Sequence, residues 1–302
     1  MTMQHILFIT LSNIGDAVMT TPVLAALHER YPDARFDIVA DARSAALFAH
    51  FDALDDIILK HKNVGWRAKL AFVRQLRRKR YDLIVDLRTD GLSWLLRARQ
   101  RLNKIRQRTP QTHSVEQHFQ ALAPLLGHAA PPPTCLWIPE AAHTAAAAHL
   151  AALPGSRWLA LGPGANWDGK IWDAARFVAL ANQCASEFDG VILLGGAADR
   201  ARAEAMQPQI HLPSVDLCGQ TGLLEAAAIL ARARAFVGND SGLGHLASAV
   251  GTPTLTVFGP GDPLRYRPWG AHARWLVAPG QDLSQLSVEQ VATVLKDLVA
   301  AP

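Results

Sequence analysis

Cysteine is scarce in this sequence, and its three cysteines, Cys135, Cys184 and Cys218, lie far apart and outside any CxxC or Cys/His pattern. Such spacing supplies neither a disulfide framework nor a zinc site. Scarce, unpaired cysteine favours a reducing, cytoplasmic setting, because disulfides are rare there. Long apolar runs are also missing, since polar residues from Ser12 onward interrupt the N-terminal stretch after about six apolar residues. We therefore expect no signal peptide and no membrane-spanning helix.

Several catalytic signatures are absent as well. The sequence has no GxxxxGK[ST], no HExxH and no GxSxG, and no obvious cluster of histidines and carboxylates at metal spacing. P-loop and hydrolase functions lose most of their support, and we expect no bound metal. The GPG strings at Gly162 and Gly259 are not GxGxxG fingerprints. A nicotinamide-dependent dehydrogenase is therefore the least favoured enzyme class.

The length of 302 residues exceeds what one hydrophobic core usually organises and favours two domains. Hydrophobic patterning predicts strands at residues 5–10, 34–40, 56–59, 83–86, 158–161, 190–194, 215–217, 235–237 and 254–258. Helices are predicted at residues 17–30, 42–48, 66–80, 174–187, 201–206, 223–231, 242–250 and 287–299. This alternation indicates an α/β fold of two Rossmann-like domains, with parallel sheets facing across a cleft and ligands at the carboxyl ends of the strands.

Four prolines between residues 131 and 139, an alanine-rich helix and a break at 154–156 mark the linker region. We place the domains at residues 1–153 and 154–302, and allow the terminal helix to pack back on the first domain.

Positive charge is concentrated in the first half. Residues 1–150 carry 19 Lys and Arg against 13 Asp and Glu, whereas residues 151–302 carry 11 against 13. Sixteen of the basic residues, but only three acidic ones, lie between Lys60 and Arg108. For any single one of these residues, a solvated helix face is as good an explanation as a binding surface. The whole cluster instead predicts a surface for an anionic partner.

Gly15 and Asp16 follow the first predicted strand and begin a helix, at the sheet edge where open α/β folds bind substrates. A carboxylate there can take the proton of an acceptor hydroxyl that attacks an anomeric carbon, so Asp16 is the candidate general base. The alternative is that Asp16 only caps the helix.

The segment GNDSGLGH offers a helix start suited to a diphosphate, with glycines that leave the first amides unobstructed. Gly242 provides such an opening, Ser241 a hydroxyl, and His245 an imidazole donor one turn later. Asp240 would repel phosphate, so we expect it to hold the loop or a ribose hydroxyl. Taken singly, Asp240 or Ser241 could be a helix cap and His245 a packed histidine. The concentration of these residues in one turn instead favours a donor site.

Two further loops follow predicted strands. In GPGANWDGKIW, Lys170 is placed to neutralise a leaving diphosphate, while Trp167 and Trp172 are interpreted as packing residues. In LLGGAADR, Gly195 and Asp199 are weaker candidates for contact with a nucleotide base or ribose, because glycines after a strand are most often plain turns.

Together, ILFITLSNIGDAVMTTPVLAAL and NDSGLGHLASAVGTPTLTVFGP resemble the two signatures of glycosyltransferase family 9, the lipopolysaccharide heptosyltransferases. The resemblance implies a GT-B architecture and metal-independent, inverting transfer from an ADP-heptose donor. By motif position Asp16 resembles the family's base, Lys170 its donor-phosphate lysine, and residues 240–245 its nucleotide-sugar loop. No cofactor beyond the donor is implied.

The family's acceptors are phosphorylated lipid-linked oligosaccharides, which matches the basic excess of the first half. We name Arg67, Lys69 and Arg88 as acceptor candidates and expect peripheral contact with the cytoplasmic face of the inner membrane, but no nucleic-acid partner. A nucleotide-sugar epimerase, a transferase with another donor, and a non-catalytic protein that binds sugar nucleotides or lipopolysaccharide remain as alternatives.

Overall fold

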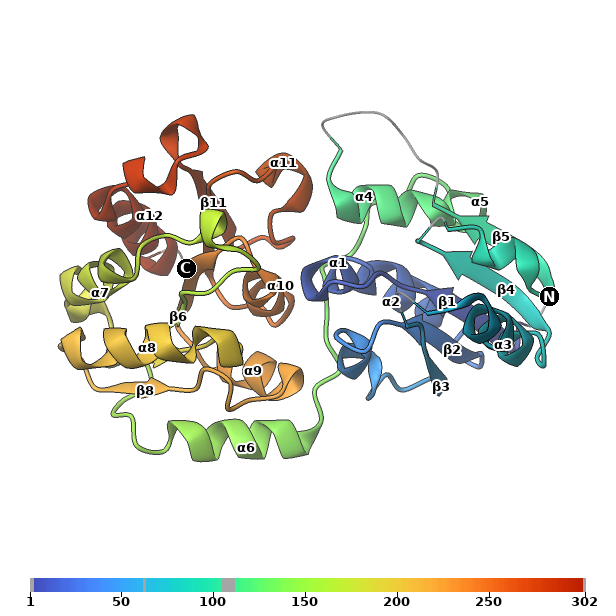
Figure 1. The fold of residues 1–302 in the computed structure, drawn as a ribbon, viewed down its shortest axis with the longest axis horizontal. Helices are drawn as coiled ribbons and strands as arrows, with labels where there is room; N and C mark the ends of the chain where they lie inside the picture. Colours follow the sequence, from blue (N-terminus) through green and yellow to red (C-terminus); the bar gives the residue numbers. More distant parts are fainter. Residues whose placement is uncertain (1–2, 62–63, 89, 105–111, 301–302) are drawn as a thin grey trace. The chain divides into compact units, whose positions relative to one another are not determined.

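The computed structural model describes residues 3–61, 64–88, 90–104 and 112–300. The chain divides into two compact units, residues 1–137 and 138–302, and each unit holds one parallel sheet (Figure 1). Within the described ranges, no helix combines the length and the apolar character needed to cross a bilayer.

The first unit is a five-stranded parallel sheet in the order β3-β2-β1-β4-β5. Its strands are β1 (His5–Ile9), β2 (Arg35–Ala40), β3 (Leu54–Leu59), β4 (Tyr81–Asp86) and β5 (Ala98–Asn103). Its helices are α1 (Ile14–Val18), α2 (Thr21–Arg30), α3 (Trp66–Leu76), α4 (Ser114–Phe119) and α5 (Ala123–Leu126), with short 3₁₀ turns η1 (Ala45–Phe48), η2 (Leu92–Leu95) and η3 (Gln120–Leu122). The strand order reverses between β1 and β4, so the loops after these strands are neighbours at the carboxyl edge.

The second unit has the six-stranded order β11-β10-β9-β6-β7-β8, the arrangement of a dinucleotide-binding fold. Its strands are β6 (Trp158–Gly162), β7 (Gly190–Leu193), β8 (Ser214–Asp216), β9 (Ala235–Asn239), β10 (Thr254–Phe258) and β11 (Ala273–Val277). Its helices are α6 (Glu140–Leu150), α7 (Ala174–Gln183), α8 (Arg200–Met206), α9 (Leu223–Leu230), α10 (Gly242–Ala249), α11 (Pro263–Tyr266) and α12 (Val288–Ala300). Its 3₁₀ turns are η4 (Asp168–Lys170), η5 (Ala185–Glu187), η6 (Ala197–Asp199), η7 (Gln207–Gln209), η8 (Pro279–Gln281) and η9 (Leu283–Gln285).

The central strands of the second unit are buried along their whole length, as expected where helices cover both faces of a parallel sheet. Helix α12 packs on α7, and α7 on α8, while α6, α9 and α10 form a second connected group. The α/β fold with two Rossmann-like units is therefore confirmed. The cleft between facing sheets stays a prediction.

The division between the units falls after Trp137 instead of at the predicted position after Leu153. Helix α6 explains the difference, because Ala142, Ala146 and Leu150 form a buried stripe at a spacing of four residues and α6 packs on α9 of the second unit. The terminal helix α12 packs on α7 and on strands β9, β10 and β11 of its own unit.

The predicted helix at residues 17–30 is split in two. The hydroxyls of Thr20 and Thr21 donate to the carbonyls of Ala17 and Val18, and Pro22 provides no backbone donor, so the chain ends α1 and starts α2 at this point. The split leaves α1 as a separate short turn directly after β1.

Candidate active site

Two of the three loops that the sequence singles out in the second half, those that follow β6 and β9, are brought together. Strands β6 and β9 are paired neighbours, and the order of the sheet reverses between them. Lys170 ends η4 in the loop after β6, and Asp240 directly follows β9. Open α/β sheets bind ligands at this position, beyond the carboxyl ends of the strands where their order reverses.

Lys170 Nζ forms an ion pair with Asp240 Oδ2, and the two side chains are 24% and 13% exposed. Asp240 also lies close to Gly261, where a Cβ would stand 2.9 Å from Asp240 Oδ2. Asp240 thus links the loop after β9 to the loop that carries Lys170, and its contact with a ribose hydroxyl stays a prediction. Lys170 keeps a partly exposed ammonium group at the carboxyl end of the sheet.

Asn239, which the sequence analysis missed, fixes the loop that carries Lys170. Its side chain is completely buried, its Oδ1 accepts from the backbone N–H of Trp172 at 2.9 Å, and its Nδ2 donates to the carbonyl of Pro163 at 3.0 Å. These bonds attach both ends of the loop to the end of β9. An asparagine that closes an otherwise apolar strand was the available signal.

The two tryptophans of this loop have different surroundings. Trp172 is fully buried, packs edge-on against Phe177 with ring centroids 4.9 Å apart, and donates from Nε1 to the carbonyl of Leu286, so its packing role is confirmed. Trp167 is 54% exposed, so its assignment as a packing residue was wrong. Its ring lies so close to Gly169 that a Cβ at this position would clash with the indole.

Helix α10 begins with its first turn unobstructed. Ser241 occupies the N-cap position but forms no side-chain cap, and its buried Oγ has no partner among the described residues. Gly242 is the first helical residue, and Gly244 lies so close to Thr256 that a Cβ would stand 3.0 Å from Thr256 Oγ1. Unpaired amides at a helix start bind anions, and the free hydroxyl adds one more donor.

His245 lies one turn into α10, is 5% exposed, and its Nδ1 has no partner among the described residues. Burial lowers the pKa of His245 to about 4. The imidazole is therefore neutral near pH 7, and it would act on a donor through a hydrogen bond and not through a full charge.

The loop after β7 has a local structural role. Asp199 Oδ2 accepts from the backbone N–H of Gly196 at 2.9 Å, and its Oδ1 pairs with Arg202 at 3.2 Å. Gly195 is needed for close approach, since a Cβ there would stand 2.8 Å from Asp199 Oδ2. Both carboxylate oxygens are thus used to shape the loop, and contact of Gly195 and Asp199 with a nucleotide stays a prediction.

In the first unit, Gly15 and Asp16 lie in the first turn of α1, directly after β1. The Asp16 carboxylate accepts a hydrogen bond of 2.9 Å from the side-chain amide of Asn13. No backbone amide of the described part of the chain donates to it. Asp16 therefore does not act as a simple helix cap, and its carboxylate is oriented by a neighbouring side chain.

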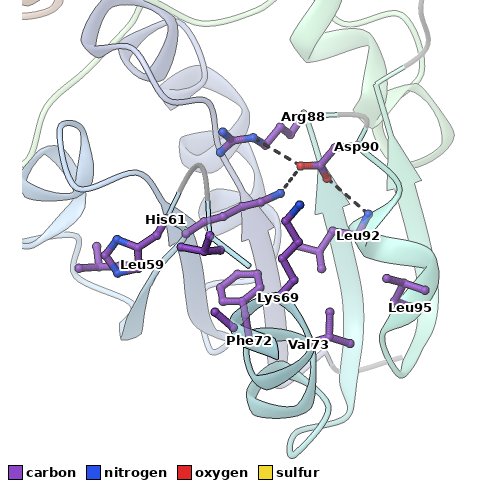
Figure 2. A pocket seen from close by; sticks show the side chains of 12 residues that line it. Leu59, His61, Lys69, Phe72, Val73, Arg88, Asp90, Leu92 and Leu95 are labelled. Carbon is purple, nitrogen blue, oxygen red and sulfur yellow. Dashed lines mark hydrogen bonds and ion pairs between the residues drawn. The ribbon is translucent and has the colours of Figure 1, made fainter. Parts of the chain in front are cut away.

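Arg88 follows β4, and its Nη2 donates to Ser12 Oγ in the loop that leads to Asp16. Its Nε lies 3.5 Å from Asp90 Oδ2, which also pairs with Lys60 Nζ. Figure 2 shows the contact of Arg88 with Asp90 at one end of a cavity of about 520 Å³. The cavity is lined by Leu59, Lys60, His61, Val64, Ala68, Lys69, Phe72, Val73, Arg88, Asp90, Leu92 and Leu95.

Two of the three acceptor candidates, Lys69 and Arg88, thus share one cavity, and Lys69 forms no ion pair with any described residue. Arg67 is not part of the lining, and its guanidinium carbon lies 5.4 Å from the centre of the Trp66 ring. Lys60 is a further cation of this cavity, which the sequence analysis counted in the basic cluster but did not name as an acceptor candidate.

A metal would need several clustered ligands. In the parts of the chain that the structure describes, no group of three or more His, Cys, Asp or Glu side chains is arranged to hold one. All three cysteines are free, and burial raises the pKa of the Cys218 thiol, assisted by Asp216.

Comparison with known proteins identifies the family of the chain. The model of glycosyltransferase family 9 (heptosyltransferase) matches residues 69–294. Lipopolysaccharide heptosyltransferase 3 of Escherichia coli is 28% identical over 286 residues, which cover 84% of this chain and 83% of the relative.

Two solved structures share the fold over almost the whole chain. E. coli ADP-heptose LPS heptosyltransferase II superposes with a TM-score of 0.80 at 24% identity, covering 98% of this chain and 99% of the other. E. coli heptosyltransferase WaaC with ADP gives a TM-score of 0.78 at 24% identity, covering 98% and 100%. Both likenesses support the GT-B fold. The chain is a glycosyltransferase and belongs to glycosyltransferase family 9, the heptosyltransferase family.

Proposed function

We propose that this protein transfers a heptose from ADP-heptose to the inner core of lipopolysaccharide or to a similar anionic glycan. The observation that carries the proposal is the Lys170–Asp240 pair beside the unobstructed start of α10. This combination suits a diphosphate, because a lysine and unpaired helix amides neutralise its charge together. The names of the relatives, lipopolysaccharide heptosyltransferase 3 and ADP-heptose LPS heptosyltransferase II, support the choice of sugar and nucleotide.

The proposed reaction is an in-line displacement with inversion. Asp16 removes the proton of an acceptor hydroxyl, the oxygen forms a bond to the anomeric carbon, and the bond between that carbon and the diphosphate oxygen breaks. ADP leaves with the electron pair, and Lys170, the first amides of α10 and the hydroxyl of Ser241 stabilise its charge. His245 donates a hydrogen bond to the donor. The reaction as proposed needs no metal and no further cofactor.

The acceptor is assigned to the first unit. The lining of the cavity of Figure 2 has three cations, Lys60, Lys69 and Arg88, against one carboxylate, that of Asp90. Arg88 also contacts the loop that precedes Asp16. This excess favours an anionic acceptor such as a phosphorylated, lipid-linked core oligosaccharide. We place the protein at the cytoplasmic face of the inner membrane for the same reason.

Calorimetric titration with ADP, UDP, GDP and CMP, each with and without EDTA, tests the donor assignment. We expect ADP to bind with the highest affinity, and EDTA to leave its affinity unchanged. A preference for UDP would point to another donor sugar or to epimerisation, and the absence of nucleotide binding would support a non-catalytic role.

A further inference from the structure

Large apolar side chains are exposed on one part of the first unit. Five of the nine large hydrophobic residues that are exposed in the described chain lie between residues 59 and 95. They are Leu59 (41% exposed), Trp66 (70%), Leu70 (40%), Trp94 (70%) and Leu95 (55%), which we call the apolar rim. Exposure of two tryptophans at this level is unusual for a surface that only meets water.

Two members of the rim, Leu59 and Leu95, line the cavity of Figure 2, and the other three belong to α3 and η2, which also contribute lining residues. Trp66, Leu70 and Val73 are spaced four and three residues apart, so they form one stripe along α3. Val73 lines the cavity together with Leu95 of η2, and Trp94 directly precedes Leu95. Leu59 lines the cavity from the end of β3. The apolar wall of the cavity therefore continues into the rim.

The rim lies in a strongly basic setting. Residues 57–81 contain nine Lys and Arg and no Asp or Glu. Arg67 and Arg74 are exposed on α3 itself. Guanidinium carbons also lie over both exposed indoles, Arg67 at 5.4 Å from the ring centre of Trp66 and Arg101 at 5.9 Å from that of Trp94.

Tryptophan and leucine beside arginine and lysine suit the interface of an anionic bilayer. Indole rings and aliphatic side chains enter the boundary of headgroups and acyl chains, while long cationic side chains reach the phosphates. Helix α3 has the composition of an interfacial helix, since one stripe is apolar and its charged residues are all basic.

We propose that the apolar rim, together with Arg67 and Arg74, docks this protein on the surface of an anionic phospholipid bilayer. The inference rests on the proposed function in one respect, the lipid-linked acceptor. Such an acceptor would reach the cavity directly from the membrane. Charge complementarity selects a lipid surface over a protein partner, because α3 carries Arg67, Lys69 and Arg74 and no acidic residue, which matches the negative charge of the leaflet.

Co-sedimentation of the purified full-length chain with vesicles tests the docking. Vesicles of phosphatidylcholine alone are compared with vesicles that also contain phosphatidylglycerol, at low and high salt. We expect binding to the anionic vesicles that weakens at high salt. Trp66→Ser and Trp94→Ser should each weaken it about tenfold, and Arg67→Gln and Arg74→Gln about fivefold each.

Trp167→Ser is the matched control, because Trp167 is an exposed tryptophan of the second unit. It should bind vesicles as the unchanged protein does, and thermal denaturation should show that all of these variants are folded. Equal binding to both vesicle types, rim variants that bind like the unchanged protein, or no binding at low salt would each overturn the docking proposal. The last result would leave the rim to a protein partner.

Turnover with a water-soluble acceptor oligosaccharide separates this inference from the proposed function. Trp66→Ser and Trp94→Ser should retain kcat on that acceptor. Vesicle binding without heptose transfer by the unchanged protein would refute the function and leave the docking intact. Transfer without any vesicle binding would refute the docking alone.

Discussion

The buried side chain of Asn239 accepts a hydrogen bond of 2.9 Å from the backbone amide of Trp172. Because Asn239 also donates to the carbonyl of Pro163, one side chain holds both ends of the loop that contains Lys170. The lysine therefore reaches Asp240 from a loop that is anchored on each side. Such anchoring keeps a charged group in place before the substrate binds, and this preorganisation is the source of electrostatic catalysis.

Asn239→Ala should lower both stability and donor affinity. The substitution leaves the Trp172 amide and the Pro163 carbonyl without their partner, and a buried unpaired polar group costs about 1–3 kcal/mol. We expect a loss of about 2–4 kcal/mol in the free energy of unfolding, measured by urea denaturation, together with weaker ADP binding. Asn182→Ala serves as the control, since it removes a similar pair of bonds, to Gln209 and His211, away from Lys170. It should leave ADP affinity unchanged, and equal loss of affinity in both variants would contradict a positioning role.

Lys170→Ala should reduce kcat/KM by about 10²–10³-fold, because it removes a charge that stabilises the leaving diphosphate. It also leaves Asp240 with an unpaired negative charge beside the donor. The double variant with Asp240→Asn should therefore be more active than Lys170→Ala alone, a non-additive result that a double-mutant cycle measures. Lys296→Ala, at an exposed lysine of α12, is the control. Strictly additive effects would argue against the pair acting at the donor.

Asp16→Ala should lower kcat by about 10²–10⁴-fold, the range typical of general-base catalysis, and leave donor affinity nearly unchanged. Asn13→Ala should have a smaller effect on kcat, since Asn13 only orients the carboxylate through its 2.9 Å hydrogen bond. The control is Asp33→Ala, at an exposed aspartate before β2. Substantial turnover by Asp16→Ala would place the base elsewhere.

Stability should depend on pH through His245. Its pKa is about 4 when folded and about 6.5 when unfolded, so between these values only the unfolded chain takes up the proton. Protonation thereby stabilises the unfolded state as pH falls. Through His245 the free energy of unfolding decreases by about 3 kcal/mol between about pH 6.5 and about pH 4. Below pH 4 this contribution changes no further.

The His245→Gln variant isolates that contribution, because glutamine does not titrate. Unfolding free energies of both proteins, measured at several pH values, should diverge in slope between pH 6.5 and 4. Parallel pH profiles would show that His245 is not kept neutral by burial.

The strands that carry the candidate site were readily predictable from sequence. Strands β1, β6, β9 and β10 are largely apolar runs that end at, or are followed directly by, a glycine or polar residue. Patterns of this kind define both a buried parallel strand and its carboxyl end. Strands β5 and β11 were missed because they lie at the edges of their sheets. Edge position allows charged residues, as in ARQRLN of β5, and removes the apolar signal.

Local side-chain geometry was much less predictable. Sequence placed Lys170 and Asp240 in two loops that each follow a predicted strand but gave no sign that they pair, because the contact joins residues 70 positions apart. The closure of the Asp199 carboxylate on its own loop involves Gly164, which only the folded backbone brings close to it. The cavity beside Arg88 likewise combines three separate segments.

Nuclear magnetic resonance of the product formed from ADP-heptose and a water-soluble inner-core acceptor, in the presence of EDTA, tests the central claim most directly. Our account predicts that a heptosylated acceptor forms under these conditions, with the anomeric configuration opposite to that of the donor. A product that retains the donor configuration, or no product until a divalent metal is restored, would contradict it.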